Sequence, residues 1–152
     1  MGAEDLHYKR SRFSTRLFTD RLYTGGHSWL RRGEGDRWQV GFTKFAVRML
    51  GEAVELGFEV PPGSEVQTGQ PIGWIEGFKA VTDLYAPFSG IFVEGNPALS
   101  KEIELVQKDP SGRGWLYTIQ GTPGDGCLDV PGYVAVLDAT IDKMLGKRHD
   151  AS

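Results

Sequence analysis

The stretch from Gly63 to Gly90 constrains the fold most, because it predicts a β-hairpin with a lysine at its tip. Two extended runs rich in β-branched and aromatic residues, 71–78 and 80–86, meet at Lys79. No Gly, Asn or Asp stands at the junction to supply the positive φ angles that tight turns favour. The turn chemistry alone would not reverse the chain here. Lys79 is therefore a candidate functional residue, and an ordinary solvated turn lysine is the alternative.

The residues that flank this hairpin form a recognisable pattern. Gly63 and Gly69 suit tight turns, and Pro87 with Gly90 closes the second strand. The pattern resembles the lipoyl and biotinyl carrier domains, in which a barrel-like sandwich of two small sheets presents one lysine for acylation by a dedicated enzyme. Fold and cofactor expectations follow from this resemblance.

The immediate neighbours of the lysine favour one kind of carrier. Biotin carriers usually place methionines on both sides of the lysine, whereas Phe78 and Ala80 stand there in this chain. A lipoyl carrier is therefore favoured over a biotin carrier. An unmodified binding domain stays open, and an enzyme with its own active site has no supporting set of residues, so no catalytic residue is predicted.

Composition places the chain among globular proteins and excludes some partners. Its 152 residues suit one domain with a hydrophobic core, and 39% apolar with 24% charged residues is typical of that class. A net charge of −3 argues against a nucleic-acid partner, and no apolar run is long enough to cross a membrane. The single cysteine, Cys127, excludes an intrachain disulfide and agrees with a cytoplasmic location.

Three segments are expected along the chain: an N-terminal extension over 1–22, a carrier domain over 23–120, and a linker with a C-terminal helix, packed on the domain, over 121–152. The extension shows neither a helical nor a strand period, so we expect an extended arm. It carries five basic residues between Lys9 and Arg21, which the sequence does not explain. An organelle transit peptide is an alternative that Glu4 and Asp5 oppose.

Local patterns predict the remaining elements. A helix begins after the N-cap Thr43 and ends at Gly51, with Met49 on its core face. A C-terminal amphipathic helix spans 133–145, with Met144 in the core. The other predicted elements are strands over 27–32, 37–41, 53–60, 88–94 and 114–119, a loop or short helix over 96–99, and a flexible connection over 121–126.

Further motifs extend the resemblance beyond the hairpin. They are His27-Ser28-Trp29, 40–43 with 50–52, 76–87, 95–99, Asp109-Pro110 and 114–116. In this order, from Tyr23 to Leu145, they resemble the H protein of the glycine cleavage system. The resemblance implies a mainly β lipoyl/biotinyl-carrier barrel-sandwich hybrid with short helices and a C-terminal amphipathic helix. It also implies lipoic acid joined by an amide to Lys79, and a carrier that is not itself an enzyme.

Departures from the family's pattern bear on the cargo. The H protein usually has a carboxylate where this chain has Ser28 and a small hydroxyl residue where it has Gly26; with Asp83, these groups would shelter an aminomethyl-loaded arm. The usual E-S-V-K-A also becomes 76–80, EGFKA. We therefore favour an H-like lipoate-binding protein of a sulfur-oxidising heterodisulfide-reductase-like system, with a bona fide glycine cleavage H protein carrying the aminomethyl group as the alternative.

The expected partners follow from these two hypotheses. They are a lipoate-attaching enzyme and either a heterodisulfide-reductase-like complex or the glycine cleavage P, T and L proteins. Glu76 and Asp83 flank the lysine, and could be recognised by the attaching enzyme or could simply solubilise the hairpin. Cys127 is either a redox partner for the arm or incidental. The histidines lack metal-ligand spacing, and His27 is expected to pack or hydrogen-bond beside Trp29.

Overall fold

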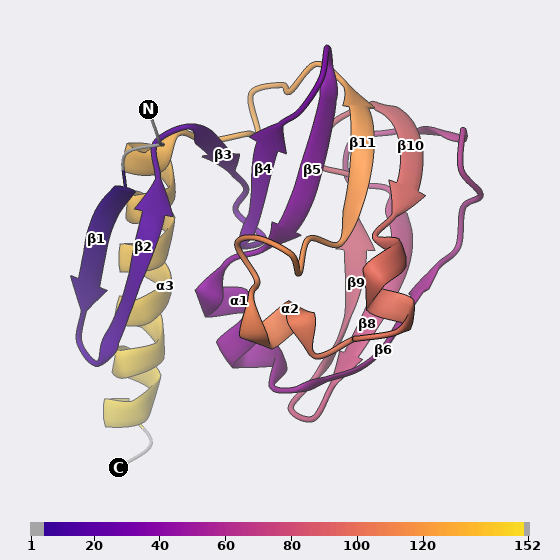
Figure 1. Cartoon of the computed structure of the whole chain (residues 1–152). Helices are drawn as coiled ribbons and strands as arrows, with labels where there is room; N and C mark the ends of the chain where they lie inside the picture. The colour runs from indigo at the N-terminus through magenta and orange to yellow at the C-terminus, as the bar shows by residue number, and fades with distance from the viewer. Residues whose placement is uncertain (1–4, 151–152) are drawn as a thin grey trace.

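The protein folds into a two-sheet sandwich with an added hairpin and helix (Figure 1). A computed structural model describes residues 5–150, with side chains through residue 146. One sheet has six strands in the order β3-β4-β5-β11-β10-β7, and the other has three in the order β6-β8-β9. Their bounds are β3 Arg21–Tyr23, β4 Ser28–Arg32, β5 Arg37–Phe42, β6 Ala53–Phe58, β7 Glu65–Val66, β8 Pro71–Gly77, β9 Val81–Tyr85, β10 Gly90–Gly95 and β11 Tyr117–Gly121.

The main core lies between these two sheets. Leu30 and Ile119 of the larger sheet and Ile72 and Ile75 of the smaller one are completely buried in a single cluster. Inward side chains alternate with outward ones along the strands, as the period of two requires. The predicted mainly β carrier-type sandwich is confirmed.

Helix α1 (Lys44–Leu50) forms where its end signals predicted it. The Thr43 hydroxyl accepts a hydrogen bond from the backbone N–H of Ala46 at 3.4 Å, and Gly51 ends the helix with φ of 78°. Phe45 and Leu50 are buried, but Met49 is 46% exposed. The core assignment of Met49 was wrong, because this side of the helix faces the groove described below.

Two short helices connect β10 to β11: η1 (Pro97–Ser100) and α2 (Leu105–Lys108). The buried Asn96 side chain caps η1 and donates to the carbonyls of Arg113 and Trp115 at 2.9 and 2.8 Å. These two carbonyls are thus already bonded to a side chain. The strand predicted from residue 114 therefore begins only at Tyr117.

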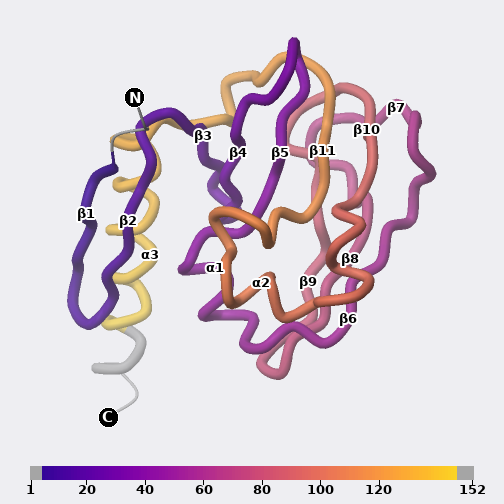
Figure 2. Tube along the Cα trace, viewed as in Figure 1, coloured from indigo at the N-terminus to yellow at the C-terminus, as the bar shows by residue number. Residues whose placement is uncertain are grey.

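The N-terminal extension is a β-hairpin rather than an extended arm. Strands β1 (Asp5–Arg10) and β2 (Phe13–Phe18) pair with each other alone, and the C-terminal helix α3 (Val130–Asp150) lies alongside them (Figure 2). The register places Tyr8 opposite Thr15 and Arg10 opposite Phe13. Polar and apolar residues thus share the face toward α3, which hid the strand period in the sequence.

Helix α3 joins the hairpin to the sandwich. Tyr8 donates a hydrogen bond to Asp138 at 2.7 Å, and Arg10 binds both carboxylate oxygens of Asp142 at 2.8 Å. On the other side, Tyr133 stacks on Tyr23 of β3 with ring centroids 4.7 Å apart. The predicted helix is present. Met144, expected in the core, is instead 41% exposed.

None of the helices within residues 5–150 has the length and apolar character needed to cross a bilayer.

Candidate functional site

Lys79 stands at the tip of the hairpin formed by β8 and β9, where the sequence placed it. The backbone N–H of Gly77 donates to the carbonyl of Ala80 at 2.8 Å and closes the turn around Phe78 and Lys79. Both side chains in the turn are exposed. The tip therefore presents its lysine to solvent.

The end of helix α1 holds this tip in place from outside. The N–H of Lys79 donates to the carbonyl of Leu50 at 3.0 Å, and the N–H of Phe78 donates to the carbonyl of Glu52 at 3.0 Å. The last carbonyls of a helix lack partners within it, so the first bond satisfies the end of α1, and Glu52 accepts the second just beyond the helix. Support from α1 explains how the chain reverses here without the usual turn residues.

Two glycines make this close approach possible. A Cβ on Gly77 would overlap the carbonyl oxygen of Leu50, and a Cβ on Gly51 would lie 3.0 Å from Cγ of Lys79. Gly51 also has a positive φ, which side chains other than glycine's disfavour. Glycine at residue 77, one of the departures in EGFKA, thus suits this packing, because the strand before the lysine lies directly on the helix end.

The amine of Lys79 is accessible and carries no ion pair within the described side chains. Its Nζ donates to the carbonyl of Arg48 at 3.0 Å, at an exposed position. No carboxylate among residues 5–146 lies within 4.0 Å of it. An acylating enzyme could therefore reach this amine by breaking one exposed hydrogen bond.

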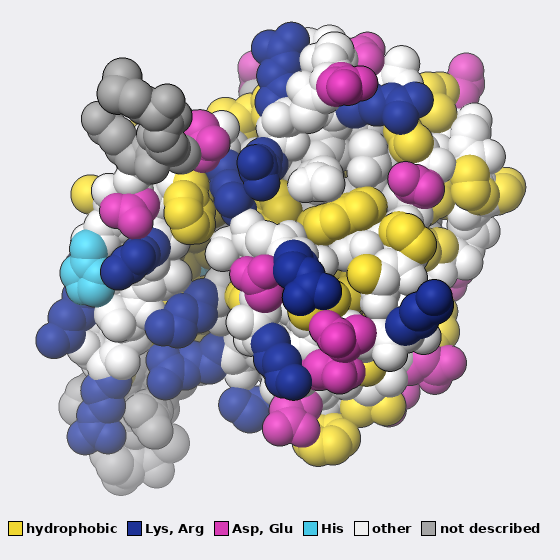
Figure 3. All heavy atoms as spheres, viewed as in Figure 1, with side chains coloured by type: hydrophobic (Ala, Val, Ile, Leu, Met, Phe, Trp, Pro, Cys, Tyr) yellow, Lys and Arg dark blue, Asp and Glu magenta, His cyan; other side chains and the backbone are white. Residues whose placement is uncertain are grey.

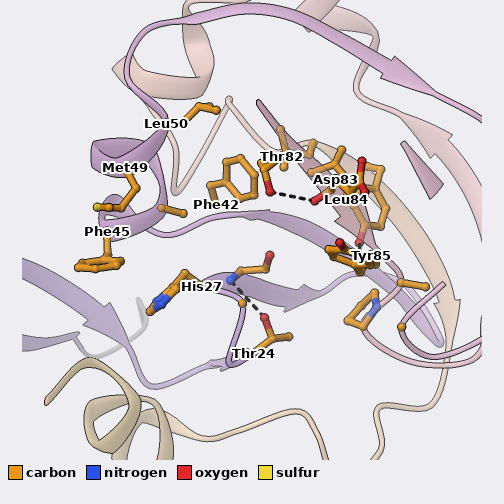
Figure 4. Close-up of a pocket in the computed structure, with 18 of the residues that line it drawn as sticks. Thr24, His27, Phe42, Phe45, Met49, Leu50, Thr82, Asp83, Leu84 and Tyr85 are labelled. Atoms are coloured by element: carbon orange, nitrogen blue, oxygen red, sulfur yellow. Dashed lines mark hydrogen bonds between the residues drawn. The ribbon is translucent and has the colours of Figure 1, made fainter. Parts of the chain in front are cut away.

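A groove of about 630 Å³ begins one residue beyond the lysine. Strand β9, which is an edge strand of its sheet, forms one wall, and helix α1 with the loop before β4 forms the other (Figure 4). Apolar side chains dominate the lining. They include Phe42, Phe45, Met49, Leu84, Tyr85 and Leu116. Such a volume and lining are typical of small-molecule sites.

The three positions linked to arm shelter in the sequence meet in this groove. Gly26 and Ser28 line the wall opposite Asp83. Asp83 is the one carboxylate among the lining residues, and it lies on the exposed face of β9. A cationic group in the groove would thus find a single counter-charge.

His27 also lies in this wall, but its partners differ from those expected. Its Nδ1 lies 2.8 Å from the hydroxyl of Tyr133, and its ring packs on Phe45 with centroids 4.5 Å apart. Trp29 instead donates to the carbonyl of Pro110. Burial lowers the pKa of His27, which favours the neutral ring.

Glu76 and Asp83 share one face of the small sheet without meeting. Glu76 pairs with Val81 and Asp83 pairs with Trp74, and both pairs point away from the core. Glu76 is half-buried, and it does not line the groove. Asp83 thus lies in the groove wall, whereas Glu76 lies near the end of β8, just before the turn that carries Lys79.

Cys127 is half-buried beside the main core. Its thiol donates weakly to the carbonyl of Pro87 at 3.7 Å, and burial raises its pKa. Since the thiolate is the reactive form, this environment disfavours redox exchange with an arm.

Sequence reasoning missed the groove-lining roles of Met49 and Tyr85 and the buried hydrogen bonds of Tyr133. Tyr133 Oη lies 2.9 Å from Oγ1 of Thr43 and so links α3 to the start of α1. Met49 carried one usable signal, because it occupies the edge of the apolar stripe of α1. The Tyr133 contact joins residues 90 positions apart, and no local pattern predicts it.

The part of the chain that the structure describes contains no cluster of three His, Cys, Asp or Glu side chains able to hold a metal ion.

Comparison with known proteins decides the family. The sequence profile described as "Glycine cleavage H-protein" matches residues 21–125, which is more than half of the chain. The chain belongs to the glycine cleavage H-protein family. As a member of this family it is a non-catalytic carrier that holds lipoic acid covalently on a lysine.

Individual relatives agree with this assignment. The chain is 41% identical over 121 residues to a glycine cleavage system H protein of Bacteroides fragilis, covering 77% of this chain and 94% of the relative. It is 40% identical over 124 residues to the H protein of Thermus thermophilus, covering 79% and 94%. A crystal structure of the H protein from Mycobacterium marinum superimposes with a TM-score of 0.68 at 35% identity, covering 77% of this chain and 95% of that one.

Proposed function

We propose that Lys79 is the lipoyl lysine of this H-family carrier and that the groove beside it receives the arm. The observation that carries the proposal is the exposed amine on a tip whose backbone is fixed by α1. A rigid tip presents the amine in one defined place, while the side chain above it stays free to be acylated. The apolar groove that starts at Ala80 fits a hydrophobic dithiolane arm.

Lipoic acid would supply the disulfide and dithiol chemistry by which cargo is taken up and released. The chain's own residues contribute binding and shelter. Phe42, Leu84 and Leu116 line the groove and exclude water from a bound arm. Tethering raises the effective concentration of cargo at each partner enzyme, so the carrier needs no catalytic group.

We further propose that the cargo is the aminomethyl group of glycine cleavage, carried between the P, T and L proteins after a lipoate-attaching enzyme has acted. The relatives named above are glycine cleavage H proteins, and this supports the aminomethyl cargo over the sulfur cargo that the departures in the sequence suggested. Asp83 would bind the ammonium of this cargo in the groove, since a charge-assisted hydrogen bond is stronger than a neutral one.

The test is glycine decarboxylation by reconstituted P, T and L proteins with the lipoylated chain. We expect activity, with Asp83→Asn lowering it because the groove loses its carboxylate. Ser28→Glu adds a second carboxylate to the opposite wall, so it should lengthen the lifetime of the aminomethyl-loaded arm in water. Glu94→Gln is the matched control for Asp83→Asn, because it also removes one carboxylate but lies outside the groove. Absence of activity with fully lipoylated protein would refute the aminomethyl proposal.

A sulfur-carrying arm remains a second candidate because of one observation. Gly26 and Ser28 leave the groove wall opposite Asp83 without charge, and this suits a neutral cargo better than a cationic one. In that case Asp83→Asn would leave arm protection unchanged, and the lipoylated chain would serve a heterodisulfide-reductase-like complex instead of the P, T and L proteins.

The surface around Lys79 offers contacts for the partner enzymes. Phe78 is 76% exposed and Val81 67% exposed, on either side of the lysine along the chain. Exposed apolar side chains of this size gathered at one tip are typical of interaction sites. Phe78→Ser, which replaces the ring by a small polar group, should slow lipoylation without changing the unfolding free energy by more than about 0.5 kcal/mol.

A further inference from the structure

A second hollow, of about 590 Å³, lies between the N-terminal hairpin and the larger sheet. Phe42 lines both this hollow and the groove beside Lys79. Its volume falls in the range of small-molecule sites. The residues of its lining that bear on the argument are Arg16, Phe18, Arg21, Trp29, Lys44 and Ser111.

Arg21 is the unusual side chain in this hollow. It is only 8% exposed, and its guanidinium lies between the rings of Phe18 and Trp29, 4.3 and 4.5 Å from their centroids. Two aromatic faces stabilise the cation and fix its plane. A structural arginine held this firmly would normally have its N–H groups bonded to acceptors.

Within the described side chains, two of those nitrogens have no acceptor. Nε and Nη1 of Arg21 are buried and have no hydrogen-bond partner among residues 5–146. Among the described side chains, an oxygen of Asp20 lies 4.0 Å from Nε, which is within ion-pair distance but beyond hydrogen-bond distance. Leaving charged donors buried and unbonded costs free energy, because water no longer solvates them. Asp20 offsets part of the charge, but both donors still lack a hydrogen-bond acceptor among the described residues.

The surrounding charges indicate which acceptor fits. Arg16, Arg21 and Lys44 line the hollow, and no Asp or Glu is among its lining residues. Lysine and arginine side chains gather over the N-terminal hairpin and at its junction with the sandwich (Figure 3). Asp20 and Asp5 lie at ion-pair distance, 4.0 and 3.9 Å, from Arg21 and Arg16, and Nζ of Lys44 donates to the carbonyl of Ser14 at 2.8 Å. The hollow keeps a positive excess, because no carboxylate lines it to oppose an anion, and a phosphate offers several charged oxygens to the unbonded donors. Guanidinium groups also match the oxygen geometry of phosphate.

We propose that this hollow binds a phosphate-bearing small molecule on the guanidinium of Arg21, and that the side chain shifts on binding so that the buried Nε and Nη1 donate to the phosphate. Lys44 and Arg16 add charge at the rim, and hydroxyls such as that of Ser111 lie within the same lining. The site depends on the hairpin that precedes the family-matched region, and Lys79 does not line it. It also gives a role to two of the five basic residues between Lys9 and Arg21.

The test uses the full chain and inorganic phosphate. Titration at constant pH and ionic strength, followed by the ¹⁵N signals of arginine side chains, should shift the Arg21 Nε–H signal saturably, whereas chloride should not. Arg21→Lys keeps the positive charge but loses the planar set of guanidinium N–H donors, so the affinity of the variant for phosphate should fall about tenfold or more. Lys44→Gln, on the rim, should weaken binding several-fold and covers the case in which the Arg21 variant fails to fold.

Arg37→Gln is the matched control, because Arg37 is exposed on β5 and does not line the hollow. Unchanged phosphate affinity in this variant supports the site. Three results would overturn it: no saturable shift at Arg21, equal weakening by Arg37→Gln, or tighter binding of acetate than of phosphate. Adenosine monophosphate then distinguishes an organic phosphate ligand from free phosphate. Tighter binding of this nucleotide than of inorganic phosphate indicates an organic phosphate, and equal binding indicates free phosphate. Both results support the site.

Discussion

Replacing Tyr133 by phenylalanine tests the buried contact that fixes the groove wall. The hydroxyl of Tyr133 lies 2.8 Å from Nδ1 of His27 and 2.9 Å from Oγ1 of Thr43, and the tyrosine is 1% exposed. Its loss leaves two polar atoms without their partner, while the ring and its stacking on Tyr23 remain. Unsatisfied buried polar groups cost about 1–3 kcal/mol.

We therefore expect Tyr133→Phe to lower the free energy of unfolding by about 1–3 kcal/mol. For a chain of this length that corresponds to a fall in Tm of roughly 2–12 °C. Urea unfolding followed by far-UV circular dichroism at pH 7.5 measures the difference. Tyr85→Phe is the matched control, because Tyr85 is 54% exposed, and its change should stay within about 0.5 kcal/mol.

A double-mutant cycle that combines Tyr133→Phe with Thr43→Val sharpens the test, because both substitutions break the same hydrogen bond. The losses of unfolding free energy in the two single variants should sum to more than the loss in the double variant. The difference, which is the coupling energy, should be about 0.5–3 kcal/mol. A Tyr133→Phe protein as stable as the wild type, or strict additivity with Thr43→Val, would refute the idea that this hydroxyl joins α3 to the groove.

Three further predictions follow from single contacts. Gly77→Ala should cost about 1–3 kcal/mol and slow lipoylation, because a Cβ would overlap the Leu50 carbonyl; wild-type stability and rate would refute this close packing. Burial lowers the pKa of His27, so the unfolded state binds its proton first and stability should fall as pH drops below about 6.5; His27→Gln should reduce that slope, and an unchanged slope would contradict it. Cys127 should react with thiol reagents more slowly than free cysteine, because burial raises its pKa, and a faster reaction would contradict this.

Local signals in the sequence predicted the elements that position Lys79. Alternating strands, the cap at Thr43 and the glycine at residue 51 each act over a few residues, so the hairpin and α1 were found. The resemblance over 23–145 then gave the sandwich, which no local pattern specifies. The docking of the tip on Leu50 is a contact between elements, and the sequence only hinted at it through an unusual turn.

Features that depend on contacts between distant segments were missed. The N-terminal hairpin has polar Arg10 and Thr15 on the face toward α3, so its strand period was invisible. Met49 and Met144 lie at the edges of apolar stripes, where spacing alone does not distinguish a core side from an open one. Arg21 looked like one basic residue among several, and only the folded arrangement of Phe18 and Trp29 around its guanidinium revealed its burial.

The central claim is that Lys79 is the lysine that carries lipoic acid. The most direct measurement is peptide mapping by mass spectrometry after the full chain has reacted with a lipoate-attaching enzyme, lipoic acid and ATP. The account predicts one lipoyl group, on Lys79, and none in the Lys79→Arg variant. Attachment at another lysine, or lipoylation that persists in Lys79→Arg, would contradict it.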